Sequence, residues 1–217
     1  MSKNLSPVCK LCRREGEKLY LKGERCFTPK CSFERRSFAP GQHGRTGSRS
    51  GGGNRMGRES DYLRQLRAKQ RARRVYGVLE RQFSRYYEIA LQRRGLTGLN
   101  LLQILESRLD NVVFRLGFAS SRSQARLMVT HGHFTVNDRK SDVPSMLLKE
   151  GDAIAVRTGS RDLTYFKGVG DLADARTSPS WLNRDTKQLS GVVQRLPERA
   201  EIDGTLNEQL IVEYYSR

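Results

Sequence analysis

The chain has 217 residues, with 40 Lys or Arg against 23 Asp or Glu and a formal net charge of +17. A charge of this size favours a polyanionic partner, of which nucleic acid is the commonest. The apolar stretches are only a few residues long, and the N-terminus lacks the hydrophobic centre of a signal peptide. We therefore expect a cytoplasmic protein that binds nucleic acid and does not enter a membrane.

All four cysteines lie within residues 1–34. Cys9 and Cys12 form a C-x₂-C pair, and four residues separate Cys26 from Cys31. Two such thiolate pairs suit one tetrahedral Zn²⁺, which would stabilise a segment with few apolar residues. We expect one structural zinc ion, with free thiols or an iron–sulfur cluster as the alternatives.

A dense run of positive charge follows the cysteines. Residues 35–58 are rich in Gly, Ser and Arg, which is typical of a flexible loop. From Arg35 to Arg74 there are twelve Arg or Lys and only two acids. A solvated helix face usually mixes opposite charges four residues apart, but "RQLRAKQRARR" contains no acid. We therefore interpret this run as a binding patch.

Helical periodicity begins in the segment "ESDYLRQLRAKQRARRVYGVLERQF". Ser60 or Asp61 is a suitable N-cap, Gly77 divides the pattern into two helices, and Gly95 ends it. The segment "NLLQILESRLDNVVFRLG" then predicts one amphipathic helix. Arg108 would share its exposed face with a second arginine seven residues later. Its buried stripe would consist of Leu101, Leu105, Leu109, Val112 and Leu116.

The next helix is shorter and begins at Ser121, which is a second predicted N-cap. Arg122 and Arg126 are four residues apart and would lie side by side on its outer face, and Gly132 would end it. "HFTV", the turn "ND" and "EGDAIAV" predict two strands. Farther on, "GVVQRLPER" indicates a short strand or extended segment, and "NEQLIVEYYSR" favours a helix over a strand.

Two arginine-bearing helices followed by a His-Gly corner and a strand-turn-strand resemble the αL-type RNA-binding fold of several translation proteins. The matching stretches are "SRLDNVVFRLGFASSRSQARLMVTHGHFTVN" and "LLKEGDAIAV". With "PGQHGR", "YLRQLRAKQRARRVYGVLERQF" and the ending "NEQLIVEYYSR", almost the whole chain resembles the family of bacterial small-subunit ribosomal proteins number four, in its cysteine-containing zinc variant.

This resemblance implies an α+β fold in two parts. Residues 1–97 would form a zinc knuckle, a basic loop and a helical rRNA-binding domain. Residues 98–177 would form the αL-type domain, with helices packed on a small, mostly antiparallel sheet. We expect the C-terminal segment 178–217 to pack on the first part.

The resemblance also implies a structural constituent of the small ribosomal subunit. Members of the family bind the 5′ domain of small-subunit rRNA at a multi-helix junction, nucleate assembly of the subunit body, and influence translational accuracy near the mRNA entry channel. The implied partners are this rRNA, the small-subunit proteins beside the entry and decoding region, and the nearby mRNA. No small-molecule substrate is expected.

Arginine suits this role because its guanidinium group grips phosphate oxygens in pairs and stacks on bases. Some of these side chains would only cover apolar surface with their stems. The expected RNA-binding set is Arg35, Arg36, His43, Arg45, Arg49, Arg55, Arg58, Arg64, Arg67, Lys69, Arg71, Arg73, Arg74, Arg81, Arg108, Arg115, Arg122, Arg126 and His131.

Two other functions are compatible with parts of the sequence. An RNA-modifying or tRNA-charging enzyme can carry an αL-type fold, but the chain has no G-x-S-x-G, P-loop or dinucleotide fingerprint, so we expect no enzyme activity. A zinc-bearing DNA-binding regulator would need the C₂H₂ spacing or a helix-turn-helix, and neither is recognisable.

Overall fold

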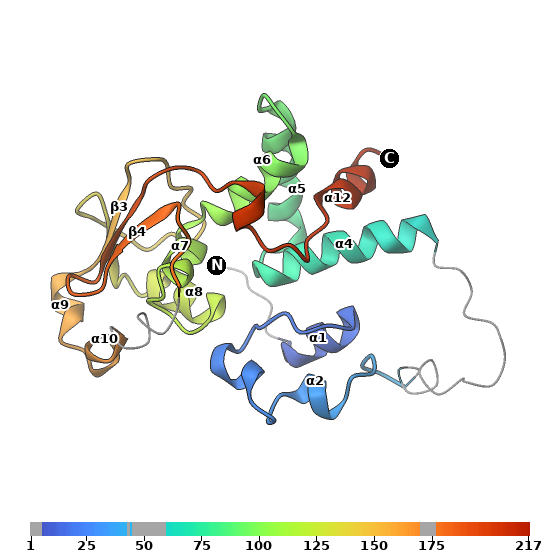
Figure 1. The fold of residues 1–217 in the computed structure, drawn as a ribbon, viewed down its shortest axis with the longest axis horizontal. Coiled ribbons are helices and arrows are strands. Elements are labelled where there is room, and N and C mark those ends of the chain that lie inside the picture. Colours follow the sequence, from blue (N-terminus) through green and yellow to red (C-terminus); the bar gives the residue numbers. More distant parts are fainter. Residues whose placement is uncertain (1–5, 43, 45–59, 170–176) are drawn as a thin grey trace. The chain divides into compact units, whose positions relative to one another are not determined.

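The computed structural model describes residues 6–42, 44, 60–169 and 177–217 and has an α+β fold (Figure 1). The chain divides into two compact units. The first, here the helical unit, comprises Met1–Arg85 with Thr205–Arg217; the second, here the sheet unit, comprises Tyr86–Gly204. No helix in the described ranges combines the length and apolar character needed to cross a bilayer.

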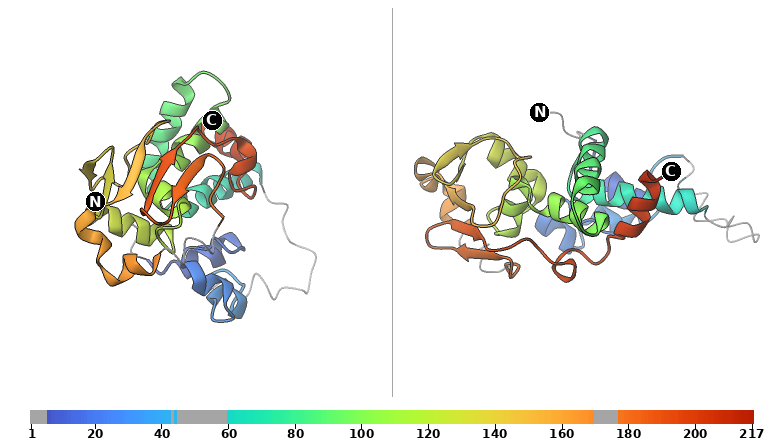
Figure 2. Two further views of the ribbon diagram at one scale, coloured as in Figure 1. Left: turned by 60° about the vertical axis from the view of Figure 1, so that its left-hand side comes forward. Right: turned by 90° about the horizontal axis from the view of Figure 1, so that it is seen from above.

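Short helices in the cysteine region and longer helices after it build the helical unit. The former are α1 (Cys9–Glu15), the 3₁₀ helix η1 (Gly23–Phe27) and α2 (Ser32–Arg35). The latter are α4 (Asp61–Val75), the start of α5 (Glu80–Gln92) and α12 (Glu208–Tyr215). Both Figure 1 and Figure 2 show α12 lying against α4, so the end of the chain packs on a helix from its first half.

The sequence predicted the boundaries of α4 correctly. The Ser60 hydroxyl oxygen accepts a hydrogen bond from the Leu63 amide at 3.3 Å, which caps the helix. Gly77 has φ +64° and separates α4 from α5, because this left-handed conformation ends a helix at little cost only for glycine. The predicted helix at the end of the chain is also confirmed as α12.

The single helix predicted from "NLLQILESRLDNVVFRLG" is wrong, because the chain forms α6 (Thr97–Glu106) and α7 (Leu109–Arg115) instead. Arg108 lies between them in an extended conformation and forms a β-bridge with Leu147. The Leu109 amide donates to the Met146 carbonyl, and the Leu148 amide donates to the Ser107 carbonyl, at 2.9 and 2.8 Å. These long-range backbone bonds replace the intrahelical ones and break the helix.

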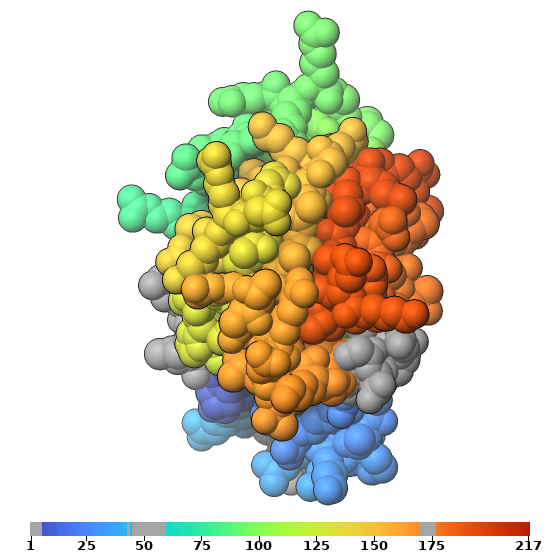
Figure 3. All heavy atoms as spheres, turned by 90° about the vertical axis from the view of Figure 1, so that its left-hand side faces the viewer, coloured from blue at the N-terminus to red at the C-terminus, as the bar shows by residue number. Residues whose placement is uncertain are grey.

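In the part of the chain that the structure describes, five antiparallel strands form one sheet in the order β2-β1-β3-β5-β4. Figure 3 shows the yellow, orange and red-orange parts of the chain, which contribute the strands of this sheet, next to one another. The predicted turn between β1 and β2 is confirmed, because Asn137 and Asp138 both have positive φ, 48° and 61°, as a tight hairpin requires. The strands are β1 (Phe134–Val136), β2 (Arg139–Ser141), β3 (Ala153–Val156), β4 (Leu182–Asp185) and β5 (Ser190–Val193).

Helices α7 and α8 (Arg122–Thr130) supply the rest of the core of the sheet unit, which includes the buried Trp181. Gly191 of β5 is required for this packing, because a Cβ atom there would lie 2.5 Å from a methyl group of Leu116. The Gly191 backbone therefore allows the end of the α7 region to approach the sheet closely. Short helices α9 (Thr158–Arg161) and α10 (Thr164–Lys167) follow β3.

The expectation that residues 178–217 pack on the N-terminal part does not hold for β4 and β5. The register Ala153↔Val192 joins β5 to β3, so both strands extend the sheet of the second unit. Only Thr205–Arg217 clusters with the helical unit. Sequence periodicity could not show this, because strand pairing is decided by partners far away in the chain.

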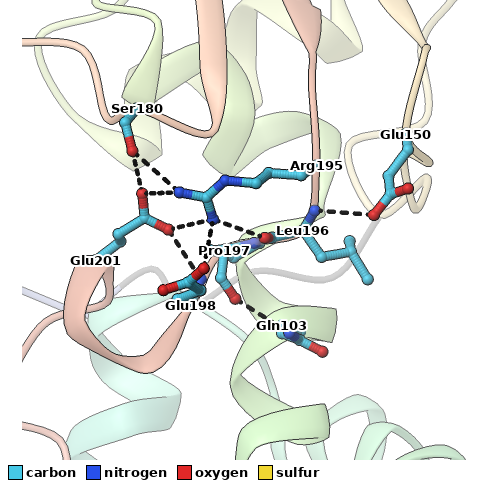
Figure 4. A network of polar contacts seen from close by, with 8 residues as sticks. All are labelled: Gln103, Glu150, Ser180, Arg195, Leu196, Pro197, Glu198 and Glu201. Atoms are coloured by element: carbon cyan, nitrogen blue, oxygen red, sulfur yellow. Dashed lines mark hydrogen bonds and ion pairs between the residues drawn. The ribbon is translucent and has the colours of Figure 1, made fainter.

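A polar network holds the segment that follows β5 (Figure 4). The Arg195 guanidinium donates to both carboxylate oxygens of Glu201, at 2.7 and 2.8 Å, and to the Ser180 hydroxyl at 3.1 Å. The Leu196 amide donates to the Glu150 carboxylate at 3.2 Å. This network ties the short 3₁₀ helix η2 (Arg199–Glu201) to the end of the sheet.

Candidate nucleic-acid interface

The basic face of α4 is paired with acids that lie outside this helix. The interpretation that "RQLRAKQRARR" lacks acidic partners is therefore wrong, since it considered only neighbours within the helix. Glu15 and Glu17 reach α4 from the N-terminal region, and Glu80 reaches it from the start of α5. Much of the charge on this helix is thus neutralised within the protein.

Glu15 illustrates this pairing, because its side chain is only 2% exposed and contacts two arginines of α4. Its carboxylate forms an ion pair with Arg67 at 3.5 Å and a close one with Arg74. Burial lowers the pKa of Arg74, although Glu15 acts in the opposite direction. Both arginines therefore connect α1 to α4.

Lys69 is buried, which disagrees with its expected role as an exposed phosphate ligand. Its ammonium group donates to Glu80 at 2.8 Å and lies 4.6 Å from the centre of the Tyr214 ring. Burial tends to raise the pKa of Glu80, but hydrogen bonds from Lys69 and Tyr215 outweigh it and leave that pKa below its usual value. Lys69 therefore links α4, α5 and α12.

Three further arginines of α4 are partly engaged. Arg71 pairs with Glu17 and donates to the Thr205 carbonyl at 2.8 Å, and Arg73 pairs with Glu80 at 3.3 Å. The Arg64 side chain is 56% exposed and has only a loose ion pair with an exposed neighbour, at 3.6 Å. Arg64 is therefore the most accessible basic side chain of this helix that we predicted to bind RNA.

In the sheet unit, Arg108 is fully buried, so the predicted exposed face that it shares with Arg115 does not exist. Its guanidinium forms two hydrogen bonds with the Asp110 carboxylate, at 2.6 and 3.0 Å, and donates to the Tyr86 hydroxyl at 2.6 Å. Burial lowers the pKa of Arg108, but Asp110 and Tyr86 more than compensate and raise it. Arg108 therefore connects α5 to α7 inside the sheet unit.

Arg115, Arg122 and Arg126 lie near the surface and are also anchored. Arg115 forms a two-pronged ion pair with Glu106, at 2.6 and 3.0 Å, and Arg126 contacts Asp110 at 3.1 Å. Arg122 donates to Asn111 at 2.8 Å. Its guanidinium also lies 4.7 Å from the centre of the Phe114 ring. These contacts hold the three arginines in fixed orientations.

Other predicted RNA ligands are exposed. Arg35 and Arg36 lie at the end of α2, and Arg81 lies on α5; none of them forms an ion pair within the described ranges. Arg35 and Arg36 line an open hollow of about 320 Å³ with Lys10 and Arg13. Four cations around one hollow make it suitable for an anionic group such as a phosphate.

His131 is exposed at the end of α8, and its ring centre lies 6.1 Å from that of His133. The His133 ring nitrogen Nδ1 is 3.0 Å from the Ser160 hydroxyl. Burial, and then the neighbouring His131, lower the pKa of His133. His131 thus remains available to a partner, whereas His133 is held by the fold.

Several exposed cations were not predicted from the sequence. All of them lie outside the charge run, on α5, just after α5 or around the sheet. In the described part of the chain none of them has an ion-pair partner. They are Arg85, Arg93, Arg94, Arg139, Lys140, Arg157 and Lys167. The spacing from the predicted Arg81, four residues earlier on the same helix, would have identified Arg85.

Five predicted ligands lie outside the described residues. They belong to the Gly- and Arg-rich segment between α2 and α4 and are His43, Arg45, Arg49, Arg55 and Arg58.

The four cysteines are free of disulfides, and Cys12, Cys26 and Cys31 are buried while Cys9 is half-buried. Burial raises the pKa of the Cys12 thiol, a hydrogen bond with the Leu19 backbone partly offsets this rise, and the charges of the other three cysteines add to it. The donor set fits tetrahedral zinc. Within residues 6–42, 44, 60–169 and 177–217, however, no three His, Cys, Asp or Glu side chains are grouped so as to hold a metal ion.

Comparison with known proteins finds a matching domain family for each part of the chain. Residues 3–106 match the ribosomal protein S4/S9 N-terminal domain, and residues 107–154 match the S4 domain. The small ribosomal subunit protein uS4 of Heliobacterium modesticaldum is 53% identical, and those of Acetivibrio thermocellus and Pelotomaculum thermopropionicum are 52% identical. In each case the alignment covers 100% of this chain and of its relative. These are ribosomal structural proteins and not enzymes, and the chain belongs to the uS4 family of small ribosomal subunit proteins.

Proposed function

We propose that this chain is a constituent of the small ribosomal subunit in the cytoplasm and binds the subunit's rRNA as a primary binding protein. The observation that carries this proposal is full-length similarity to uS4 proteins in a chain of net charge +17. Cations that the fold leaves exposed supply the attraction to phosphate, and anchored arginines such as Arg115 supply fixed geometry.

The proposed binding site is a multi-helix junction in the 5′ domain of the rRNA. A junction brings phosphates of several helices close together, and a protein recognises such RNA mainly by its shape and backbone. Exposed cations in both units, among them Arg36, Arg81 and Arg157, suit contacts with more than one RNA helix. Binding of this kind would nucleate the body of the subunit.

We further propose neighbouring small-subunit proteins as partners, with a position near the mRNA entry channel where the protein influences accuracy. This part rests on the family and on the exposed apolar side chains of the sheet unit, such as Leu96 at 76% exposure, which are available for protein contacts.

Chemical footprinting of the full chain on protein-free small-subunit rRNA tests the proposal. Protection should be confined to one junction in the 5′ domain, and affinity should fall steeply with salt because condensed cations are released on binding. Duplex DNA of the same length serves as the competitor. Equal binding to DNA and rRNA would support the DNA-binding alternative, and absence of any protected junction would reject the proposed function.

We also propose that Cys9, Cys12, Cys26 and Cys31 hold one structural Zn²⁺. Three buried thiols and one half-buried thiol in one short region, with no disulfide among them, support this proposal. The apolar residues buried in the cysteine region are few, so a metal would add stability that the core of this region does not provide. The metal would stabilise the thiolate form of all four residues.

Native mass spectrometry of the full chain tests the metal proposal. One zinc ion per chain and four thiols that resist alkylation are expected, and a chelator should release the ion and expose all four. Iron and sulfide in the measured mass would indicate a cluster instead. A metal-free mass with four reactive thiols would reject the site.

A further inference from the structure

Two aromatic rings are exposed next to each other in the cysteine region of the helical unit. Tyr20 and Phe27 stack with ring centres 4.9 Å apart and planes inclined by 27°. Tyr20 is 47% exposed, and Phe27 is 72% exposed, one of the most exposed large apolar side chains in the described residues. We refer to these two residues as the aromatic pair.

Buried neighbouring residues and the backbone conformation fix the position of the aromatic pair. Phe27 is the last residue of η1 and directly follows the buried Cys26, whose sulfur accepts a hydrogen bond from the Lys22 amide at 3.4 Å. Tyr20 follows the buried Leu19 and has φ +50°, an unfavourable conformation for a bulky residue. Both rings are therefore fixed by residues that point inward beside them.

The exposure of the pair is not explained by the fold. Leu19 and three of the cysteines are the only apolar residues buried within residues 6–42. A segment so short of buried apolar area would gain stability from covering a phenylalanine, yet the Phe27 ring remains in solvent. An exposed, oriented apolar surface of this kind indicates a binding partner.

The charged side chains around the aromatic pair indicate what kind of partner binds there. Lys22, Arg25 and Lys30 are exposed and have no ion pair among the described residues, and Glu24 is the single acid between them. Lysine is depleted at the centre of protein–protein interfaces, whereas RNA-binding surfaces combine cations with aromatic rings that stack on unpaired bases.

We propose that the aromatic pair is a stacking platform for an unpaired nucleobase of RNA, with Phe27 offering its face and Tyr20 supporting it from behind. This inference rests on the proposed rRNA-binding function and assigns one of its contacts. The surrounding cations would contact the phosphates on either side of the stacked base.

The test compares binding of a small-subunit rRNA transcript by the full-length protein and three variants. Phe27→Leu removes the aromatic face and keeps an apolar side chain, Phe27→Tyr keeps the face, and Leu63→Ala removes another exposed apolar side chain of the helical unit. Phe27→Leu should weaken binding roughly 5- to 150-fold, which is the usual loss per stacked base, whereas Phe27→Tyr and Leu63→Ala should change it less than twofold.

Salt dependence supplies the second measurement. Phe27→Leu removes no cation, so the slope of log affinity against log salt should equal that of the unmutated protein, and thermal unfolding should be unchanged because the ring is exposed. Normal rRNA binding by the original protein together with normal binding by Phe27→Leu would overturn the platform while leaving the rRNA function intact. If the original protein itself ignores rRNA, the proposed function fails and the platform with it.

A protein partner for the pair has a different signature. In that case Phe27→Leu would bind rRNA normally and enter reconstituted small subunits poorly when the other subunit proteins are present. That result would also overturn the platform.

Discussion

Arg108 and Lys69 are basic residues that serve the fold, although their sequence context indicated RNA binding. Each is almost completely buried and satisfied by a carboxylate and an aromatic residue, Asp110 with Tyr86 and Glu80 with Tyr214. A buried charge is tolerated only with such partners, since water cannot solvate it. The residue type and the charge of its sequence neighbours therefore do not distinguish a phosphate ligand from a member of an internal ion pair.

Replacing Arg108 by alanine should destabilise the sheet unit by about 3 kcal/mol, because Asp110 loses its closest partner while remaining buried. Urea unfolding measures this loss. Arg157→Ala, which removes an exposed arginine from the same unit, should change stability by less than about 0.5 kcal/mol. If Arg108→Ala unfolds like the original protein and binds rRNA more weakly, Arg108 contacts RNA and our assignment is incorrect.

Replacing Glu15 by glutamine should cost about 1–3 kcal/mol, because two arginines of α4 lose a buried charged acceptor. Unfolding of the helical unit, followed by circular dichroism in urea, reports the change. Glu88→Gln is the matched control because Glu88 is exposed and should have little effect. Equal stability of the two variants would mean that Glu15 does not join α1 to α4.

At the level of elements, features set by nearby residues were predictable and features set by distant ones were not. The N-cap at Ser60, the Gly77 break and the Asn137–Asp138 hairpin depend on local backbone preferences. The break between α6 and α7 depends on backbone hydrogen bonds with residues 144–148, which no helical pattern can reveal. In the same way, the acids that neutralise α4 lie outside the segment whose charge was counted.

The Arg195–Glu201 network makes a prediction about pH (Figure 4). Hydrogen bonds from Arg195 lower the pKa of Glu201 from 4.5 to about 2. Because the pKa in the folded state lies below that in the unfolded state, the network contributes its full stability above about pH 5 and loses it as the pH falls towards 2. The contribution is small, since solvent around the partly exposed Arg195 weakens the ion pair.

Urea unfolding of the original protein and of Glu201→Gln between pH 7 and pH 2 measures this effect. The difference in the free energy of unfolding between the two should shrink steadily below pH 5. Asp142→Asn, which changes an exposed acid in the same unit, should show no such trend. A difference that stays constant with pH would mean that Glu201 does not titrate with a lowered pKa.

For the whole molecule, the net charge of +17 correctly indicated a nucleic-acid partner but overstated how much of α4 is free to contact it. Composition does not show which cations form ion pairs within the protein. It therefore predicted the class of partner but not the surface that contacts it. The exposed Arg81 and Arg85 of α5 are better candidates for phosphate contacts than Lys69 or Arg74.

The double variant Arg81→Gln, Arg85→Gln should lower rRNA affinity and reduce the slope of log affinity against log salt by about 1–2, because each phosphate contact releases roughly one cation. Filter-binding titrations between low and moderate salt measure the slope, and thermal unfolding should not change. A slope equal to that of the original protein would place the RNA contacts on other residues.

Helix α12 has a consequence for synthesis on the ribosome. It brings Glu213, Tyr214 and Tyr215 to partners on α4 and α5, among them Gln65 and Glu80. The helices of the helical unit therefore lack part of their packing contacts until the last thirteen residues have been synthesised. The strands of the sheet, in contrast, have all been translated earlier. A nascent chain that stops before α12 would contain every strand of the sheet but would lack the helix that packs on α4.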